Sequence, residues 1–319
     1  MLWFILTGAL LLIVLMIFLL TRTFFLVCCG RQPSGLAGLV IRLGMANAGE
    51  PLTEAADGAL FWKEASPEAV SITSFDGLTL RGEFLSRPGS QRTVVCVHGY
   101  RGTGVSNFAP VLPVLAGMGC DILLIDQRAC GRSGGSYIAF GMKERHDVAG
   151  WCRWLTEERG CRHPIYLDGI SLGCSTVLMA SDLELPENVC GIIADCGFTS
   201  AYEIIASVVR SLLHLPARLV MPLLQLAARR ELGMGLDAVS TEDCVRHTRI
   251  PILFAHGGKD RFVPPDMGVR NYMACGSEKW LLLSPEAAHG ESWLKSREAY
   301  MQLIQELFRH TSGGRTQEV

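Results

Sequence analysis

Three polar residues stand where they could share a proton-transfer chemistry: Ser171, Asp260 and His289. Ser171 lies in Gly169-Ile170-Ser171-Leu172-Gly173, between a short apolar run and an apolar, small-residue segment of helical character. A strand, a sharp turn and a helix in this order are typical of a nucleophile elbow, which holds a strained serine clear of a sheet. The flanking glycines let the two backbones approach without a Cβ clash. An ordinary strand-to-helix turn fits the same five residues, so the rest of the chain must decide.

The partners that a serine nucleophile needs occur further along the chain. Asp260 follows the apolar run 252–255, and His289 follows the run 280–283. A neutral imidazole can remove the serine proton, and a carboxylate can orient that imidazole. The backbone amide of Leu172, at a helix start, and that of Tyr100, after the run 94–97, are candidate donors to a developing oxyanion. Taken singly, Asp260 could instead cap a helix, and a histidine in a loop is often only solvated.

Short apolar runs recur between segments of helical length, and they must position these residues. They are continuous rather than alternating, which indicates strands buried on both faces, as in a parallel sheet covered by helices. Segments 70–75 and 78–86 flank Asp76-Gly77, which predicts an antiparallel hairpin at the start of the sheet. The parallel strands are expected at 94–97, 122–125, 165–167, 192–194, 252–255 and 280–283.

Between the fourth and fifth of these parallel strands the alternation pauses. Leucine, isoleucine and valine at helical spacing predict two or three amphipathic helices, interrupted at Pro216 and Pro222. We interpret about 199–249 as a helical cap over the carboxyl edge of the sheet, where open α/β sheets place their sites. Its apolar surface with a basic rim favours an acyl chain as ligand. The alternative is that these residues only pack the cap onto the sheet.

The first 20 residues are almost continuously apolar, which is long enough to cross a bilayer. No positive segment precedes them and no small-residue cleavage site follows, so we expect an uncleaved anchor over 1–29. Arg22, Arg31 and Arg42 follow the apolar run before the first acidic residue, Glu50, which predicts a cytoplasmic catalytic domain. We expect a connector without a motif at 30–67, the main domain at 68–312 and a flexible tail at 313–319. Removal of residues 1 to about 30 should then leave an active domain.

Composition narrows the possible partners. The 319 residues are 49% hydrophobic and carry a net charge of -2 without a basic run, which argues against a nucleic-acid partner. The 12 cysteines form no Cys-x-x-Cys pair and several fall in expected strands, so we interpret them as small buried hydrophobic residues in a reducing compartment. Lipidation of Cys28 or Cys29 stays open, as does the oligomeric state. Neither a metal nor another cofactor is expected. His98 and His256 precede glycines at strand ends and have no Asp or Glu at zinc spacing beside them, so we interpret them as residues that pack loops.

From about Val70 to Phe308 the chain resembles α/β-hydrolases of the serine-aminopeptidase-like and BEM46-like group. It carries, in order, H-G-Y-R-G, D-Q-R-A-C-G-R-S-G-G, G-I-S-L-G, H-G-G-K-D-R-F-V-P and A-H-G. The order Ser, Asp, His is also the order of that fold. The resemblance implies a mostly parallel sheet flanked by helices, Ser171 as nucleophile, His289 as general base, Asp260 as its orienting acid, and oxyanion amides from Leu172 and Tyr100. One departure, Ala129-Cys130 where relatives more often have glycine and histidine, concerns the shape of a loop.

These residues predict acyl transfer to water, with a carboxylic ester as the expected substrate because an alkoxide leaves more easily than an amine. Peptidase, thioesterase and transacylase activities stay open. A membrane-tethered binding module without activity is the alternative of another class, and loss of a triad member would be its mark. Asp126, Arg128 and Arg132 could clamp a substrate anion, but we favour structural ion pairs between loops.

Overall fold

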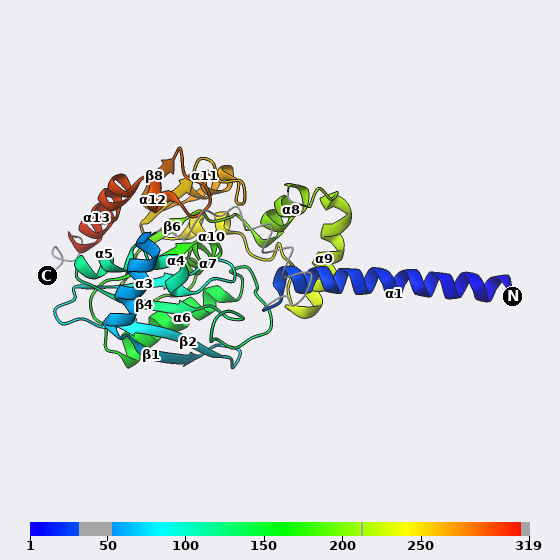
Figure 1. Cartoon of the computed structure of the whole chain (residues 1–319), viewed down its shortest axis with the longest axis horizontal. Helices are drawn as coiled ribbons and strands as arrows, with labels where there is room; N and C mark the ends of the chain where they lie inside the picture. The colour runs from blue at the N-terminus through cyan, green and yellow to red at the C-terminus, as the bar shows by residue number, and fades with distance from the viewer. Residues whose placement is uncertain (32–52, 212, 314–319) are drawn as a thin grey trace.

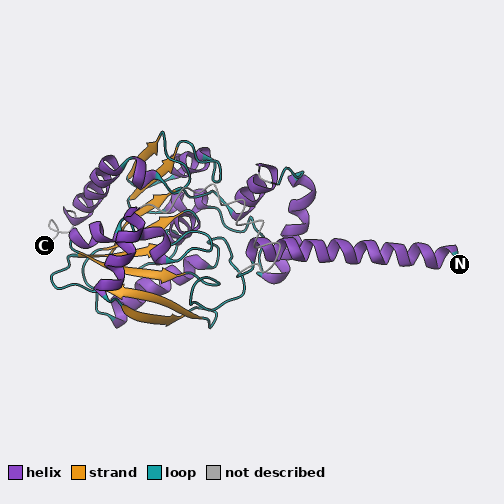
Figure 2. Ribbon diagram, in the orientation of Figure 1, coloured by secondary structure: helices purple, strands orange, loops and turns teal. Residues whose placement is uncertain are grey.

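The computed structural model describes residues 1–31, 53–211 and 213–313, and these residues build an eight-stranded sheet between two layers of helices (Figure 2). The strand order is β1-β2-β4-β3-β5-β6-β7-β8. The pairs β1–β2 and β2–β4 are antiparallel, and all the others are parallel. The strands are β1 Glu68–Thr73, β2 Thr79–Leu85, β3 Arg92–Val97, β4 Cys120–Asp126, β5 Ile165–Ile170, β6 Val189–Asp195, β7 Ile252–Gly257 and β8 Lys279–Ser284.

The expected sheet is confirmed, including the hairpin around Asp76-Gly77, which joins β1 to β2. Every residue of β4 is buried. Alternate residues of β3 pack on opposite faces of the sheet: Val95 and Val97 belong to one hydrophobic cluster, and Val94 and Cys96 to another. Burial on both faces is why such strands read as continuous apolar runs.

Two sets of helices form these clusters with the strands. One face carries α3 Thr53–Ala65, α4 Gly104–Phe108, α5 Leu112–Gly117, α12 Ser292–Lys295 and α13 Arg297–Gly313. The other carries α6 Glu144–Arg153 with the π-helical turn Trp154–Glu158, α7 Leu172–Ala180, α10 Thr241–His247 and α11 Pro265–Ala274. Consecutive parallel strands are thus connected across the sheet faces, and their carboxyl ends share one edge.

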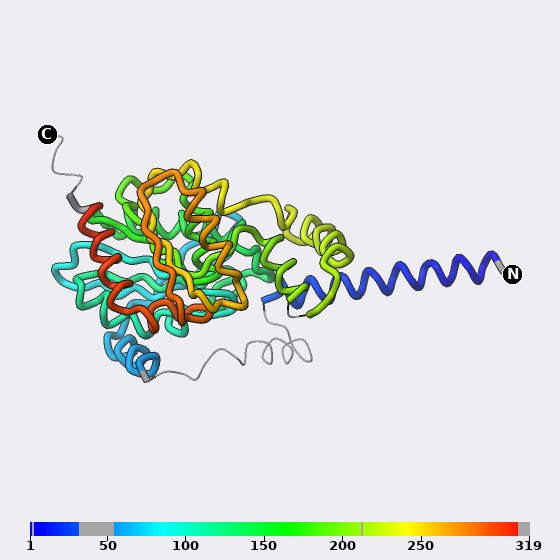
Figure 3. Tube along the Cα trace, turned by 90° about the horizontal axis from the view of Figure 1, so that it is seen from above, coloured from blue at the N-terminus to red at the C-terminus, as the bar shows by residue number. Residues whose placement is uncertain are grey.

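Three further helices lie beyond that edge. They are α1 Leu2–Cys29, α8 Ala201–Ser211 and α9 Ala217–Glu231. Helix α1 projects from the body, and α8 and α9 lie beside its carboxyl-terminal part in both views (Figures 1 and 3). Within Trp3–Cys29 of helix α1, a window of 18 residues has a mean hydropathy of 2.9 and is not buried, so by length and composition the helix could cross a membrane.

The structure differs from the sequence prediction in the connector expected at 30–67. Its second half contains α3, whose Trp62 is buried and donates from Nε1 to Glu83 Oε2 at 2.6 Å. Helix α3 packs on α4 and α5, so this segment is part of the body. The large apolar residues of α3, Leu60, Phe61 and Trp62, are consecutive, so the sequence shows no helical period there. Residues 32–52 of the expected connector, and 314–319 of the expected tail, lie outside the described residues.

The cap also differs from the expected 199–249. Helix α10 packs on α7 and α11, so it belongs to the body, and the cap consists of α8 and α9. Pro222 lies inside α9 and does not interrupt it. A proline there removes one backbone hydrogen bond near the helix start. Burial of Met221, Leu224 and Ala228 on the inner face of α9 offsets that loss.

Candidate active site

Ser171 lies at the turn between β5 and α7, with φ 57° and ψ -114°. A positive φ is strained for a residue with a side chain, and it persists only where the surroundings hold it. A Cβ on Gly173 would come within 1.8 Å of the Val97 carbonyl oxygen, and one on Gly169 within 2.4 Å of the Gly173 carbonyl oxygen. The backbone N–H of Ser171 donates to Asp195 O at 2.8 Å. The turn therefore has the backbone conformation expected of a nucleophile elbow.

The three candidate catalytic residues meet at the carboxyl edge of the sheet. His289 Nε2 lies 2.9 Å from Ser171 Oγ, and His289 Nδ1 lies 2.7 Å from Asp260 Oδ2. Asp260 follows β7, and His289 follows β8, so three separate connections supply the three side chains. When Nδ1 carries its proton toward the carboxylate, Nε2 is free to accept the hydroxyl proton of Ser171.

Asp260 is buried, and each of its oxygens has partners. Oδ1 accepts the backbone N–H groups of Phe262 at 2.8 Å and Val263 at 2.9 Å. Burial raises the pKa of Asp260, but hydrogen bonds from His256 and His289 outweigh burial and hold this pKa well below its usual range. The carboxylate is therefore ionised at neutral pH, as an acid that orients an imidazolium must be.

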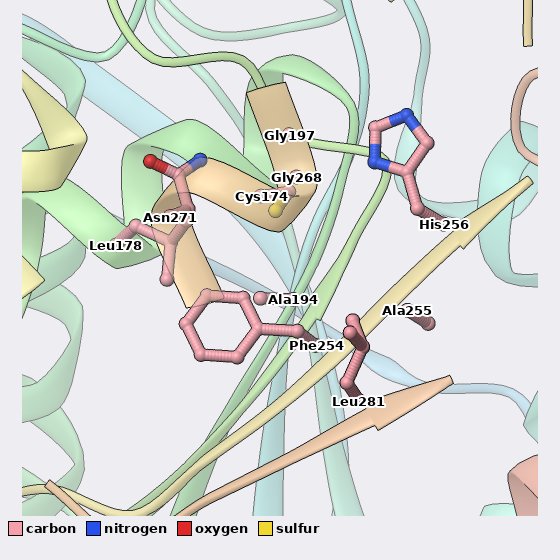
Figure 4. Close-up of a pocket in the computed structure, with 10 residues that line it drawn as sticks. All are labelled: Cys174, Leu178, Ala194, Gly197, Phe254, Ala255, His256, Gly268, Asn271 and Leu281. Carbon is pink, nitrogen blue, oxygen red and sulfur yellow. The ribbon is translucent and has the colours of Figure 1, made fainter. Parts of the chain in front are cut away.

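His256 is a second imidazole on the same carboxylate. Its Nε2 lies 3.4 Å from Asp260 Oδ2 and 3.1 Å from Val263 O. Figure 4 shows this ring beside a cavity of about 10 Å³ that Cys174, Gly268 and Asn271 also line. A Cβ on Gly268 would come within 2.3 Å of His256 Nδ1, so only glycine fits under the ring. The expectation that His256 packs a loop is confirmed, and the residue also holds Asp260 in place.

The two expected oxyanion donors lie beside the serine. Leu172 follows Ser171 directly and begins α7. The loop with Tyr100 passes close by, because a Cβ on Gly99 would come within 3.4 Å of Ser171 Cβ. Within the part of the chain that the structure describes, neither the Tyr100 nor the Leu172 amide donates a hydrogen bond to the protein. Both amides are thus available to a developing negative charge.

The end of α1 holds the other side of that loop. Tyr100 Oη donates to Cys28 O at 2.6 Å. Arg101 Nη2 donates to Val27 O at 2.8 Å and to Gly30 O at 2.7 Å. A cation is favourable at a helix carboxyl terminus, where unpaired carbonyl groups concentrate negative charge. The end of α1 therefore contacts the loop that carries Tyr100, so the expected boundary between anchor and catalytic domain is bridged by these hydrogen bonds.

Apolar packing strengthens the same junction. Phe25 and Cys29 are each 1% exposed and belong to one cluster with Phe140, Leu172 and Phe198. Phe25 also contacts Tyr137 edge-on, with ring centroids 5.4 Å apart. The burial of Cys29 leaves it inaccessible for lipidation in this conformation. The sequence does not predict this docking, because an apolar helix end has the same composition whether it contacts lipid or protein.

The predicted structural ion pairs are confirmed. Arg128 is buried between Asp147, with both contacts at 2.7 Å, and Asp76, at 2.8 and 3.1 Å. Arg132 pairs with Asp126 at 3.2 Å and with Glu83 at 2.9 Å. His98 accepts from the Gln127 amide through Nε2, while its Nδ1 lies 2.7 Å from Gly99 O. These contacts hold the loops around the site in place. Because Arg128 and Arg132 are both paired with carboxylates, neither is available to bind a substrate anion.

Asp195 and Cys196 are two buried residues beside the triad to which the sequence analysis assigns no role in the site. Asp195, at the end of β6, accepts from Ser292 Oγ at 2.9 Å, and burial raises its pKa. Cys196, Asp260 and His289 each present one ligand atom within 4.8 Å of the others. Burial raises the pKa of the Cys196 thiol, so it stays protonated, which is not the form that binds a metal. The expectation that no metal is needed stays a prediction.

All 12 cysteines lie in the described part of the chain and none forms a disulfide; nine of them are buried and three half-buried. This agrees with their interpretation as small hydrophobic residues. The structure divides the apolar residues of the cap into two groups. Ile204, Val209 and Leu224 are buried in the cluster with the end of α1. Leu219, Leu223 and Leu226 are exposed on the outer side of α9.

Comparison with known proteins identifies the fold that this chain shares with them. A family model described as alpha/beta hydrolase fold matches residues 92–219. The chain has the α/β-hydrolase fold, and its likeness to known proteins supports a hydrolase.

Particular relatives agree with this class. YqkD of Bacillus subtilis is 24% identical over 245 residues, which are 77% of this chain and 80% of YqkD. Bem46 of Schizosaccharomyces pombe is 25% identical over 244 residues, or 74% of this chain and 75% of Bem46. The resemblance to BEM46-like proteins is therefore confirmed.

Solved structures show the same fold. The esterase Pf2001 of Pyrococcus furiosus has a TM-score of 0.61 and 22% identity, covering 79% of this chain and 94% of the esterase. An acylaminoacyl peptidase of Pyrococcus horikoshii has a TM-score of 0.58 and 19% identity, covering 82% of this chain and 45% of the peptidase. Esterases and peptidases thus both occur among its structural neighbours.

Proposed function

We propose that this protein is a membrane-anchored serine hydrolase that cleaves carboxylic esters through a covalent acyl-enzyme. The observation that carries the proposal is the pair of hydrogen bonds joining Ser171, His289 and Asp260, at 2.9 and 2.7 Å. Hydroxyl, imidazole and carboxylate in this order are the parts that nucleophilic acyl transfer requires. A binding module without activity would have no need to keep a strained serine in contact with an imidazole that a carboxylate orients.

In the proposed reaction, Ser171 Oγ attacks the carbonyl carbon while its proton passes to His289 Nε2. The carbonyl oxygen becomes an oxyanion and accepts from the Leu172 and Tyr100 amides, each such donor contributing a factor of about 10² to 10³ in kcat. His289 then gives its proton to the departing alkoxide, which leaves an acyl group on Ser171. Water, deprotonated by His289, attacks this ester and releases the acid. Asp260 stabilises the imidazolium throughout.

Helix α1 is proposed to be the anchor, with the catalytic domain in the cytoplasm. Arg22 and Arg31 flank the carboxyl end of the apolar segment, and no charged side chain precedes them. Positive residues are retained on the cytoplasmic side during insertion. Orientation can be measured by protease protection of sealed vesicles, where a cytoplasmic domain is degraded without permeabilising the inverted vesicle.

The activity test is hydrolysis of p-nitrophenyl butyrate by the full chain in detergent. Ser171→Ala should abolish turnover above background. Ser86→Ala is a matched control, because Ser86 is exposed and follows β2 away from the triad. Equal turnover in the Ser171 variant would overturn the assignment. A higher kcat/KM for a peptide anilide or an acyl thioester than for the ester would favour the peptidase or thioesterase alternative.

A further inference from the structure

Helix α9 exposes an apolar face with no protein partner among the described residues. Leu219 is 64% exposed, Leu223 40% and Leu226 68%. Their spacing of four and three residues places them on one side of the helix, opposite the buried Met221 and Leu224. We call these three residues the α9 leucine face. An exposed apolar surface of this kind marks an interaction site more often than a scattered single leucine does.

The neighbour of this face is α1. Arg22 Nη1 lies 3.1 Å from Glu231 Oε1, and the Arg230 guanidinium lies 5.5 Å from the centroid of the Phe18 ring. The two views agree that α8 and α9 are the part of the body that reaches furthest along α1 toward the amino terminus (Figures 1 and 3). The cap is therefore the first part of the body that a bilayer around α1 would meet.

The position of Arg22 gives the level of that bilayer. Arg22 is the first charged side chain of the chain. The apolar residues before it, at about 1.5 Å per residue, span roughly 30 Å, which is the thickness of a hydrocarbon core. Arg22 thus marks the boundary between the hydrocarbon core and the headgroups. Because Glu231 pairs with Arg22, the end of α9 lies at the same level.

The charges around the face fit lipid headgroups. Arg218, Arg229 and Arg230 are exposed on α9, and its one acid, Glu231, is engaged with Arg22. A helix with leucines on one side and arginines at its margins is typical of helices that lie in the plane of a membrane interface. Arginines there can reach anionic phosphate groups while the leucines enter the acyl boundary.

We propose that the α9 leucine face inserts into the interface of the same bilayer that α1 crosses, so that the cap is a second membrane contact. The proposal rests on α1 being the anchor, which is part of the proposed function. It goes beyond an anchor because it fixes the orientation of the body: the cap and the adjoining carboxyl edge of the sheet, with Ser171, face the membrane. The chemistry of the partner is an anionic phospholipid surface.

The test is photocrosslinking of the full chain in vesicles of phosphatidylcholine and phosphatidylglycerol. The photoreactive residue p-benzoylphenylalanine replaces Leu226 in one variant. It replaces Leu12 of α1, which is 68% exposed, in a positive control. It replaces Met273 in a negative control, because Met273 is 70% exposed near the end of α11, toward the amino edge of the sheet. Mass spectrometry detects the phospholipid adduct on each labelled peptide.

We expect lipid adducts at positions 12 and 226 and none at position 273. Adducts at 12 without adducts at 226 would overturn the second contact while leaving the anchor intact. No adduct at 12 would overturn the anchor and this proposal with it. A chain-to-chain adduct at 226 would assign the face to a second copy of the protein, and equal adducts at 226 and 273 would show unspecific contact. Each variant should keep the melting temperature of the parent protein, because all three positions are exposed.

Discussion

Replacement of Phe25 by alanine tests whether the end of α1 is part of the active site. Phe25 is 1% exposed and packs in the cluster that contains Leu172. Truncation of a buried phenylalanine to alanine costs about 3–5 kcal/mol. In a domain of this size each kcal/mol lowers Tm by about 2–4 °C, so Tm should fall by roughly 6 to 20 °C. Phe25 packs in the cluster between α1, the cap and the body, so the loss falls first on the docking of α1.

Undocking of α1 also removes the hydrogen-bond acceptors of Arg101, which lies in the same loop as Tyr100. Arg101 would lose Val27 O and Gly30 O, and its Nε and Nη1 already lack partners among the described residues. Arg101 is half-buried, and a guanidinium that loses two acceptors has to find new partners, so we expect the loop with Tyr100 to rearrange. Complete loss of one oxyanion donor lowers kcat by about 10² to 10³, which is the upper bound for this variant.

The assay is the rate at which the full chain in detergent hydrolyses p-nitrophenyl butyrate, together with its Tm. Phe4→Ala is the matched control, because Phe4 lies on the same helix and is 79% exposed. A chain that begins at Arg31 should behave like Phe25→Ala, whereas a chain that begins at Arg22 keeps the docked turns and should retain activity. If Phe25→Ala hydrolyses the ester at the parental rate with the parental Tm, the end of α1 does not support the site.

Three other variants test the surroundings of the site. Arg128→Ala should destabilise the protein by about 3–5 kcal/mol in denaturant unfolding, since it leaves Asp147 buried without its partner. Gly173→Ala should prevent folding, as judged by circular dichroism, because its Cβ would lie 1.8 Å from a carbonyl oxygen. Asp260→Asn should lower kcat by roughly 10⁴ with little change in KM, since the amide favours the wrong tautomer of His289. The pKa of Asp260 is lower in the folded protein than the unfolded value of about 3.9, so the ionised carboxylate stabilises the fold above that pH and this contribution is lost as the pH falls below it. Tm of the parent protein should therefore decrease below about pH 4, and Tm of Asp260→Asn should decrease less.

Two matched controls accompany these variants. Arg246→Ala removes an exposed ion pair with Asp243, and such pairs contribute about 0.2–1 kcal/mol. Gly117→Ala places its Cβ where nothing lies within 4 Å, so the protein should fold normally. If Arg128→Ala unfolds at the same denaturant concentration as Arg246→Ala, the buried network does not hold the loops.

The sequence predicted those features that depend on local chemistry. The turn at Ser171 is set by the two glycines beside it, and the parallel strands are set by continuous apolar runs. The order of Ser171, Asp260 and His289 along the chain then follows from the order of the strands that precede them. The structure brings all three together as expected, because the carboxyl ends of β5, β7 and β8 meet at one edge.

The features that the sequence missed depend on contacts between distant segments. The role of Arg101 appears only when α1 and the loop after β3 are placed side by side, and these segments are about 70 residues apart. In the sequence Asp195 simply follows a predicted strand, and its hydrogen bond from Ser292 appears only in the structure. Leu224 and Leu226 are the same residue type, two positions apart, and only packing decides that one is buried and the other exposed.

The central claim is that Ser171 is a nucleophile activated by His289 and Asp260, and a fluorophosphonate probe tests it most directly. The intact membrane-reconstituted protein is treated with the probe, digested, and mapped by mass spectrometry. We predict one phosphonylated residue, Ser171, with labelling abolished in Ser171→Ala and slowed by orders of magnitude in His289→Ala. Labelling at another serine, or none at all in a protein that retains its parental Tm, would contradict the account.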